Sequence, residues 1–218
     1  MAEIKVLSLE TVTRRGSLAV LSGEIVCGTY EGDEKSSHSP ELVPNIKILL
    51  EQIEINLREI ELIAVANGPG SFTGLRIGLA TAKALSSALQ IPAIGVSLLE
   101  AAVAAKQENN SSKVNCVVFP AGRGEVFAQN FILDENGCQI SLGEVERIEL
   151  KTLLSKILEN KSQLVAPLEL WNEILSLAYE NKNKIVGFPQ NIAAAIGKIA
   201  VGRYEQITKS GELAAFYL

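Results

Sequence analysis

The sequence predicts an α/β protein with mixed sheets and flanking helices. Three observations predict this class. Short apolar runs typical of strands alternate with segments of helical periodicity, the chain opens on three consecutive strands, and the second half loosely repeats the order of the first. A polar, aperiodic stretch over residues 107–113 separates the two halves. We therefore expect two similar subdomains, over residues 1–106 and 107–218.

Composition restricts the class of function and the compartment. The chain has 218 residues, a net charge of −5 and 47% hydrophobic residues. Such a balance argues against a free-standing nucleic-acid binder, which is usually basic. No apolar run has the length of a membrane span and no signal peptide is recognisable, so we expect a cytoplasmic protein without membrane contact. Cys27, Cys116 and Cys138 are odd in number and far apart, which favours reduced, buried thiols over disulfides.

The first elements are an antiparallel meander followed by a helix. Apolar runs over 4–9, 17–21 and 25–30 predict three strands, with Gly23 in the turn between the second and third. Residues 40–53 carry a helical stripe, and Ser39 followed by Pro40 is a plausible helix start. The apolar positions of this stripe are Leu42, Val43, Ile46, Leu49, Leu50 and Ile53.

The stretch 62–89 predicts a strand, a turn and a helix in one unit. Leu62–Ala66 is continuously apolar, as in a strand buried on both faces. A glycine turn over 67–70 follows, and Ser71 or Thr73 then caps a helix that runs to about Leu89.

This central helix has little polar surface. Its charged side chains are Arg76 and Lys83, and a ridge of small residues at a spacing of four lets another helix or backbone approach closely. The ridge consists of Gly74, Gly78, Ala82 and Ser86. A helix of this composition needs cover on the side away from its sheet as well, either from this chain or from another.

The remaining elements complete the repeated order. A strand over 93–96 and a helix over 97–106 end the first half. In the second half we expect strands over 114–119, 125–133, 138–142, 163–166 and 185–188, turns over 120–124 and 134–137, and helices over 150–158, 168–179 and 191–204.

The glycine turn and Glu10 are the candidate phosphate-binding residues. Glycines before a helix N-terminus suit phosphate, but neither a P-loop nor a dinucleotide fingerprint is present, so a tight structural turn is the favoured interpretation. Glu10, at the end of the first strand, could hold magnesium beside a phosphate, although a structural or turn-capping role is favoured. The candidate turn comprises Glu10, Gly68, Gly70 and Ser71.

The sequence offers few residues for other kinds of catalysis. His38 is the single histidine and lies in a polar segment, so a metal site is not expected. A serine nucleophile elbow of the form Gly-x-Ser-x-Gly is absent, and Cys116 falls in a predicted buried strand as packing. We therefore predict no catalytic residues and no metal ligands in this chain.

The order of residues around the central turn resembles a known family. The run Gly68-Pro69-Gly70-Ser71-Phe72-Thr73-Gly74-Leu75-Arg76-Ile77-Gly78 is similar to the signature of the TsaB family, also called YeaZ. That family serves the bacterial synthesis of threonylcarbamoyladenosine (t6A) on tRNA and is paralogous to TsaD. Further similar segments are 38–44, 91–101 and 121–127, so the resemblance covers most of the first half and thins afterwards.

The resemblance implies a fold and a role. The fold is that of the actin/Hsp70/sugar-kinase (ASKHA) proteins, with two subdomains, and the role is that of a non-catalytic subunit supporting TsaD. Family members pair with TsaD, or with themselves when TsaD is absent, through the helices matching 40–53 and 73–89. A TsaE-like ATPase completes the set, ATP and metal are expected on the partner subunits, no cofactor is bound by this chain alone, and tRNA is contacted only indirectly. The predicted interface residues are Pro40, Leu42, Ile46, Leu49, Gly74, Arg76, Ile77, Gly78, Thr81, Ala82, Lys83 and Leu85.

The chain departs from the family pattern at three places. Glu10 stands where an aspartate is usual, Pro120 stands where an acid is expected, and the C-terminus is shortened to Phe216-Tyr217-Leu218. These departures argue against nucleotide binding by this chain alone and leave the partner role intact, because that role depends on the helices. Two alternatives stay open: a metallopeptidase or kinase of the same fold, and a homodimeric binding module outside tRNA modification.

Overall fold

The structure is a computed structural model that divides the chain into two compact units. It describes residues 3–33, 38–106, 114–133, 139–160, 162–177, 185–189 and 191–210. The first unit comprises Met1–Ala101 and Asn191–Leu218, and the second comprises Ala102–Gln190. Each unit is built around its own five-stranded mixed sheet.

The first sheet contains the predicted meander and two parallel strands. Its strand order is β3-β2-β1-β4-β5, in which β1, β2 and β3 pair antiparallel while β4 and β5 run parallel to β1. The predicted meander is confirmed, and the strands over 62–66 and 93–96 are found with their predicted bounds. The bounds are β1 Lys5–Glu10, β2 Ser17–Ser22, β3 Ile25–Glu31, β4 Leu62–Ala66 and β5 Ala93–Val96.

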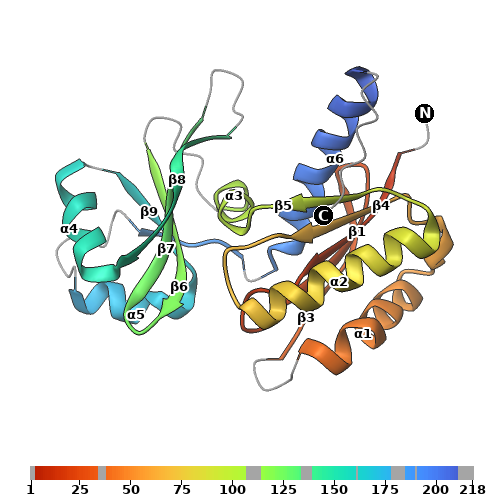
Figure 1. The fold of residues 1–218 in the computed structure, drawn as a ribbon, viewed down its shortest axis with the longest axis horizontal. Helices are drawn as coiled ribbons and strands as arrows, with labels where there is room; N and C mark the ends of the chain where they lie inside the picture. The colour runs from red at the N-terminus through yellow and green to blue at the C-terminus, as the bar shows by residue number, and fades with distance from the viewer. Residues whose placement is uncertain are drawn as a thin grey trace. The chain divides into compact units, whose positions relative to one another are not determined.

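Helices cover both faces of this sheet (Figure 1). On one face lie α1 (His38–Gln52) and α2 (Phe72–Leu89), which bury a cluster of sheet residues that includes Leu7, Leu9 and Val20. On the other lies α6 (Ala193–Ser210), where Gly197 meets Leu21, the residue after Val20 on β2. Successive residues of a strand point to opposite faces, so the sheet is a middle layer between two helix layers.

The predicted boundary between the two subdomains was wrong for helix α6. The prediction placed all of 107–218 in the second subdomain, but α6 packs on β1, β2, β4 and β5 of the first unit. Its N-terminus is held where Ser17 Oγ accepts a 3.3 Å hydrogen bond from the backbone N–H of Ala193. Farther along, Arg203 donates to Gly95 O at 2.9 Å and pairs with Glu100 at 2.6 Å. The physical reason is that the first sheet has a second apolar face, and the last helix buries it.

Two short elements lie beside β4 and β5 in the sequence. The connector before β4 contains a 3₁₀ turn, η1 (Leu57–Glu59), closed by a capping box with Asn56. Helix α3 spans Leu98–Ala104 and so ends two residues before the predicted Lys106.

The second unit is also a mixed sheet with helices packed on it. Its strand order is β10-β9-β6-β7-β8, with β6, β7 and β8 antiparallel and β9 parallel to β6. Helices α4 and α5 pack on it around a cluster that includes Val118, Leu150 and Ile174. The bounds are β6 Asn115–Gly122, β7 Glu125–Leu133, β8 Gln139–Glu149, α4 Leu150–Asn160, β9 Gln163–Val165, α5 Leu168–Leu177 and β10 Ile185–Val186.

Two details of this unit differ from the prediction. Pro120 lies inside β6, and the hairpin turn is formed by Gly122, Arg123 and Gly124, all with positive φ. Strand β8 continues to Glu149, well beyond the predicted residue 142, and it is exposed along most of its length as the edge of the sheet. The predicted turn over 134–137 lies outside the described residues.

The cysteines occupy different environments. Cys116 is buried in β6, as predicted, and burial, with a smaller contribution from Glu146, raises the pKa of its thiol to about 12. Cys27 is exposed on the edge strand β3, so the expectation of a buried thiol was wrong there. Cys138 lies outside the described residues. Within the described part of the chain, none of the helices has both the length and the apolarity needed to cross a bilayer.

Candidate functional site

The glycine turn joins β4 to α2 as the sequence predicts. Ser71 is the N-cap of α2, and its Oγ accepts a hydrogen bond from the backbone N–H of Gly74 at 3.2 Å. Gly68 and Gly70 have φ values of +107° and +154°, which side-chain-bearing residues rarely adopt. The Gly68–Pro69 peptide bond is cis.

The small residues of α2 serve the chain's own sheet. A Cβ atom on Gly74 would lie 1.9 Å from Thr11 O, and one on Gly78 would lie 2.3 Å from Thr11 Oγ1. Ala82 is fully buried in the same cluster as the strand residues. This ridge lets α2 approach the segment after β1, so Gly74, Gly78 and Ala82 pack inside the first unit, and their predicted place in a partner interface stays a prediction.

Glu10 is a turn-capping residue. Its side chain is 1% exposed, and Oε1 accepts the backbone N–H groups of Val12 and Thr13, each at 2.7 Å. Oε2 accepts the hydroxyls of Thr13 at 2.7 Å and Ser17 at 3.4 Å. These four hydrogen bonds fix the segment that connects β1 to β2, which agrees with the favoured structural interpretation.

The described pocket that Glu10 lines does not include the other candidate phosphate-binding residues. The backbone N–H of Ser71 donates to Val12 O at 2.9 Å, so it is engaged with the chain itself. The hollow that Glu10 lines is shared with Arg15, Tyr30 and Glu41, and Gly68, Gly70 and Ser71 are not among its described lining residues. Phosphate binding at the turn stays a prediction from the sequence.

The predicted interface residues of α1 mostly point inward. Leu42, Ile46 and Leu49 are 6%, 4% and 1% exposed and pack in the core of the first unit. In this structure their side chains serve the chain's own core, and their predicted place in a partner interface stays a prediction. The helical stripe that identified them is the stripe that faces the sheet. The side chain of Pro40 lies outside what the structure describes.

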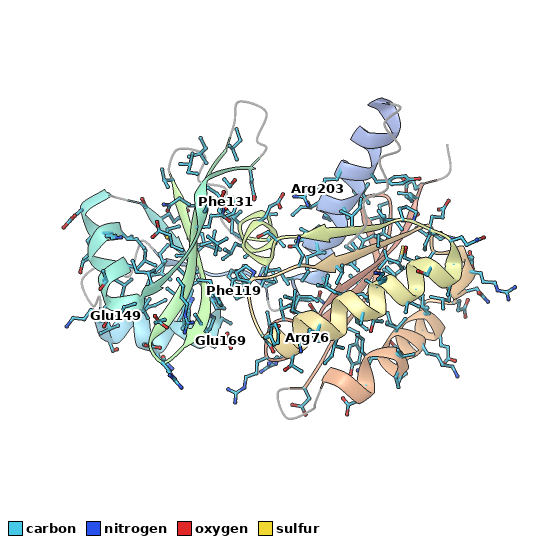
Figure 2. All side chains as sticks on the ribbon, in the orientation of Figure 1. Arg76, Phe119, Phe131, Glu149, Glu169 and Arg203 are labelled. Atoms are coloured by element: carbon cyan, nitrogen blue, oxygen red, sulfur yellow. The ribbon has the colours of Figure 1, made fainter. Side chains whose placement is uncertain are left out.

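The outward face of α1 and α2 carries different residues. Arg76 and Lys83 are exposed as an interface requires, while Ile77, Thr81 and Leu85 are half-buried beside them. Figure 2 labels Arg76 near the N-terminal end of α2, and its guanidinium carbon lies 3.9 Å from the centre of the Phe72 ring. We use the term outward face for the exposed side chains of the two helices: Glu41, Val43, Pro44, Lys47, Ile48, Glu51, Gln52, Phe72, Thr73, Arg76, Ala80, Lys83, Ala84, Ser87 and Ala88.

Several of these residues were missed by the sequence analysis. Phe72 is 64% exposed, Val43 63% and Ile48 43%, although apolar residues of this size usually lie inside. On α2 the exposed residues at 76, 80 and 84 lie opposite the buried residues at 74, 78 and 82. Placing the small-residue ridge against the sheet would have identified the exposed residues of α2.

Comparison with known proteins relates this chain to one family. Residues 33–211 match the family model described as TsaD, tRNA N6-adenosine threonylcarbamoyltransferase. The chain is similar to the tRNA threonylcarbamoyladenosine biosynthesis protein TsaB of Escherichia coli, with 32% identity over 62% of this chain and 58% of that protein. It is 27% identical to the TsaB of Buchnera aphidicola from Schizaphis graminum, over 81% of this chain and 85% of that protein.

The match to the E. coli protein spans less than two thirds of that relative's length. Among solved structures the chain is similar to YeaZ from Pseudomonas aeruginosa, with a TM-score of 0.74, 20% identity, and coverage of 93% of this chain and 94% of that one. This likeness confirms the predicted two-subdomain ASKHA-like fold.

Proposed function

The chain belongs to the tRNA N6-adenosine threonylcarbamoyltransferase (TsaD) family, among its TsaB (YeaZ) members, and on that premise we propose that it is a partner subunit in forming t6A on tRNA. The observation that carries the proposal is the family match over residues 33–211, which includes α1, α2 and the glycine turn. The matches do not favour a metallopeptidase, a kinase or a module outside tRNA modification.

Within this proposal the chain is a non-catalytic scaffold for a TsaD-type protein. The outward face supports this role, since it exposes Phe72, Val43 and Ile48 beside a row of alanines. Exposed apolar side chains grouped on one helical surface are characteristic of protein–protein contacts. The catalytic groups, the ATP and the metal are assigned to the TsaD-type and TsaE-type partners, and tRNA is bound through them.

The proposal also includes self-association and a cytoplasmic location. In the absence of the TsaD-type protein, a second copy of this chain is the expected occupant of the same two helices. The cytoplasmic location is proposed together with the role, because the proposed substrate is tRNA.

Reconstitution tests the function directly. We would prepare an extract from cells that lack this chain, add the purified protein, and measure t6A in tRNA by mass spectrometry of nucleosides. The expected result is that t6A forms only after addition, and that the purified chain alone forms none. Equal t6A in the extract without the chain would refute the proposed function.

A further inference from the structure

The outward face is asymmetric in charge. Helix α2 contains Arg76 and Lys83 and no acidic residue in its 18 residues, in a chain with a net charge of −5. Both side chains are exposed, and among the described residues neither is paired with a carboxylate. On the neighbouring α1, Lys47 lies 3.6 Å from Glu51 and so has an internal counter-charge. The uncompensated positive charge of this face is therefore on α2.

A helix that packs on α2 would come close to both Arg76 and Lys83, because the residues around them are small. Arg76 and Lys83 are seven residues apart, which is about 10 Å along a helix. Ala80 lies between them, and Ala84 and Ala88 follow, all exposed. Small side chains let a second helix approach closely, so its side chains would come within reach of both cations. Charges removed from water at an interface require opposite charges or hydrogen-bond acceptors there.

We propose that the outward face selects, by charge, a helical partner that has acidic side chains on its contacting surface in preference to a second copy of this chain. The inference rests on the proposed function and adds a rule of partner selection to it. A symmetric dimer presents the same patch on both sides, so a second copy would bring its own Arg76 and Lys83. Its acids on this face would be Glu41 and Glu51 of α1, and Glu51 already lies beside Lys47. A partner helix with acidic side chains on its contacting surface would neutralise both cations.

Nucleic acid is the weaker occupant for this surface. RNA binding relies on many phosphate contacts, on the order of 6–10 for tight complexes. Only two uncompensated cations are available on α2, and the alanine row between and beyond them suits the packing of a helix. RNA binding therefore enters the test as an outcome against the proposal.

The two assemblies should respond to salt in opposite directions. Salt screens attraction between unlike charges and repulsion between like charges, with a Debye length of roughly 10 Å at 0.1 M and about 3 Å at 1 M. Salt should weaken the complex with an acidic partner. The same salt should strengthen self-association or leave a monomer unchanged.

The experiment uses the full chain and the TsaD-type protein of the same genome. Sedimentation velocity at 50 and 500 mM NaCl measures self-association, and titration calorimetry at both concentrations measures the complex. The test variant is Arg76→Glu/Lys83→Glu, with the neutral Arg76→Gln/Lys83→Gln as a second variant. Lys151→Glu/Lys156→Glu on the exposed side of α4 is the matched control, because it changes the net charge equally in the other unit.

We expect the test variant to bind the TsaD-type protein at least about tenfold more weakly than wild type at 50 mM NaCl. The affinity of the neutral variant should fall between the two, and that of the control should stay within about twofold of wild type.

A test variant that binds as tightly as wild type would overturn the charge rule and leave the proposed function standing. Self-association that salt dissociates would also overturn it. Wild-type chain that fails to bind the TsaD-type protein would count against the proposed function, and the self-association measurements would still decide the charge rule. Retention of tRNA by the wild-type chain alone, lost in the test variant, would overturn the inference in favour of a nucleic-acid surface.

Discussion

The two sides of helix α2 are built from similar small residues but do different work. The inward side places Gly74, Gly78 and Ala82 against the chain's own strands, with Gly74 in contact with the backbone of Thr11. The outward side places Ala80, Ala84 and Ala88 in solvent, together with Arg76 and Lys83. The comparison teaches that a small-residue ridge indicates a close approach but does not say to what. Substitutions on the two sides should therefore separate stability from partner binding.

The largest effect is expected for Gly74→Ala. In a helix this change normally stabilises by up to about 1 kcal/mol, but here the new Cβ would overlap Thr11 O. We expect the free energy of unfolding to fall by about 2 kcal/mol or more, measured by urea denaturation. Gly202→Ala in α6 is the matched control, because no atom lies within 4 Å of its Cβ position, and it should stabilise slightly. A stabilised Gly74→Ala would contradict the inward assignment of the ridge.

The next effect is expected for Glu10→Gln. Glu10 holds the segment on which the inward side of α2 packs. In Glu10→Gln the side-chain NH₂ group would face hydrogen-bond donors of Val12 or Thr13 in place of a carboxylate oxygen. The expected loss of stability is about 2 kcal/mol, present without added nucleotide or magnesium. Thermal denaturation with and without ATP and magnesium measures it, with the exposed Glu24→Gln as control. A wild-type stability that rises with ATP and magnesium, and a variant that differs from wild type only in their presence, would instead support a phosphate site.

A smaller effect is expected for Thr11→Val. Thr11 Oγ1 donates to Gly74 O at 2.7 Å, and valine keeps the shape while removing the donor. The free energy of unfolding should fall by about 1 kcal/mol in urea denaturation. Thr29→Val on the exposed edge strand is the comparison, and it should be close to neutral. An equal effect at both positions would show that this hydrogen bond does not anchor α2.

The smallest effect on stability is expected on the outward side. Ala84 is exposed, so Ala84→Trp should change the free energy of unfolding by less than about 0.5 kcal/mol. The same urea denaturation as for Gly74→Ala measures it. A loss comparable to that of Gly74→Ala would mean that this side of α2 is packed and unavailable to a partner.

Local elements were predictable from the sequence, but their long-range arrangement was not. Continuous apolar runs identified β4 and β5, and Ser71 identified the start of α2, since each signal lies within a few residues. The return of α6 to the first sheet depends on which distant face needs cover, and no local pattern encodes that. The full length of β8 was missed because an exposed edge strand has no buried face to impose alternation.

The candidate site was predicted only in part for a related reason. The sequence placed the interface on two helices and chose residues such as Leu42 and Gly78, which the structure packs against the sheet. Burial against the chain's own sheet and burial against a partner select the same residue types, so composition cannot separate them. Arg76 and Lys83, which were chosen as well, are exposed, because a charged residue on an otherwise apolar helix favours the accessible side.

The most direct test of the account is the affinity of the Ala84→Trp variant for the TsaD-type protein, measured by titration calorimetry beside wild type. Tryptophan adds bulk without charge, so it tests close helix approach at the outward face independently of the charge rule. We expect binding at least about tenfold weaker, equivalent to about 1.4 kcal/mol, with unchanged thermal stability. Ser155→Trp on the exposed side of α4 should bind as wild type does. Equal affinity of Ala84→Trp and wild type would contradict the assignment of this face as the partner surface.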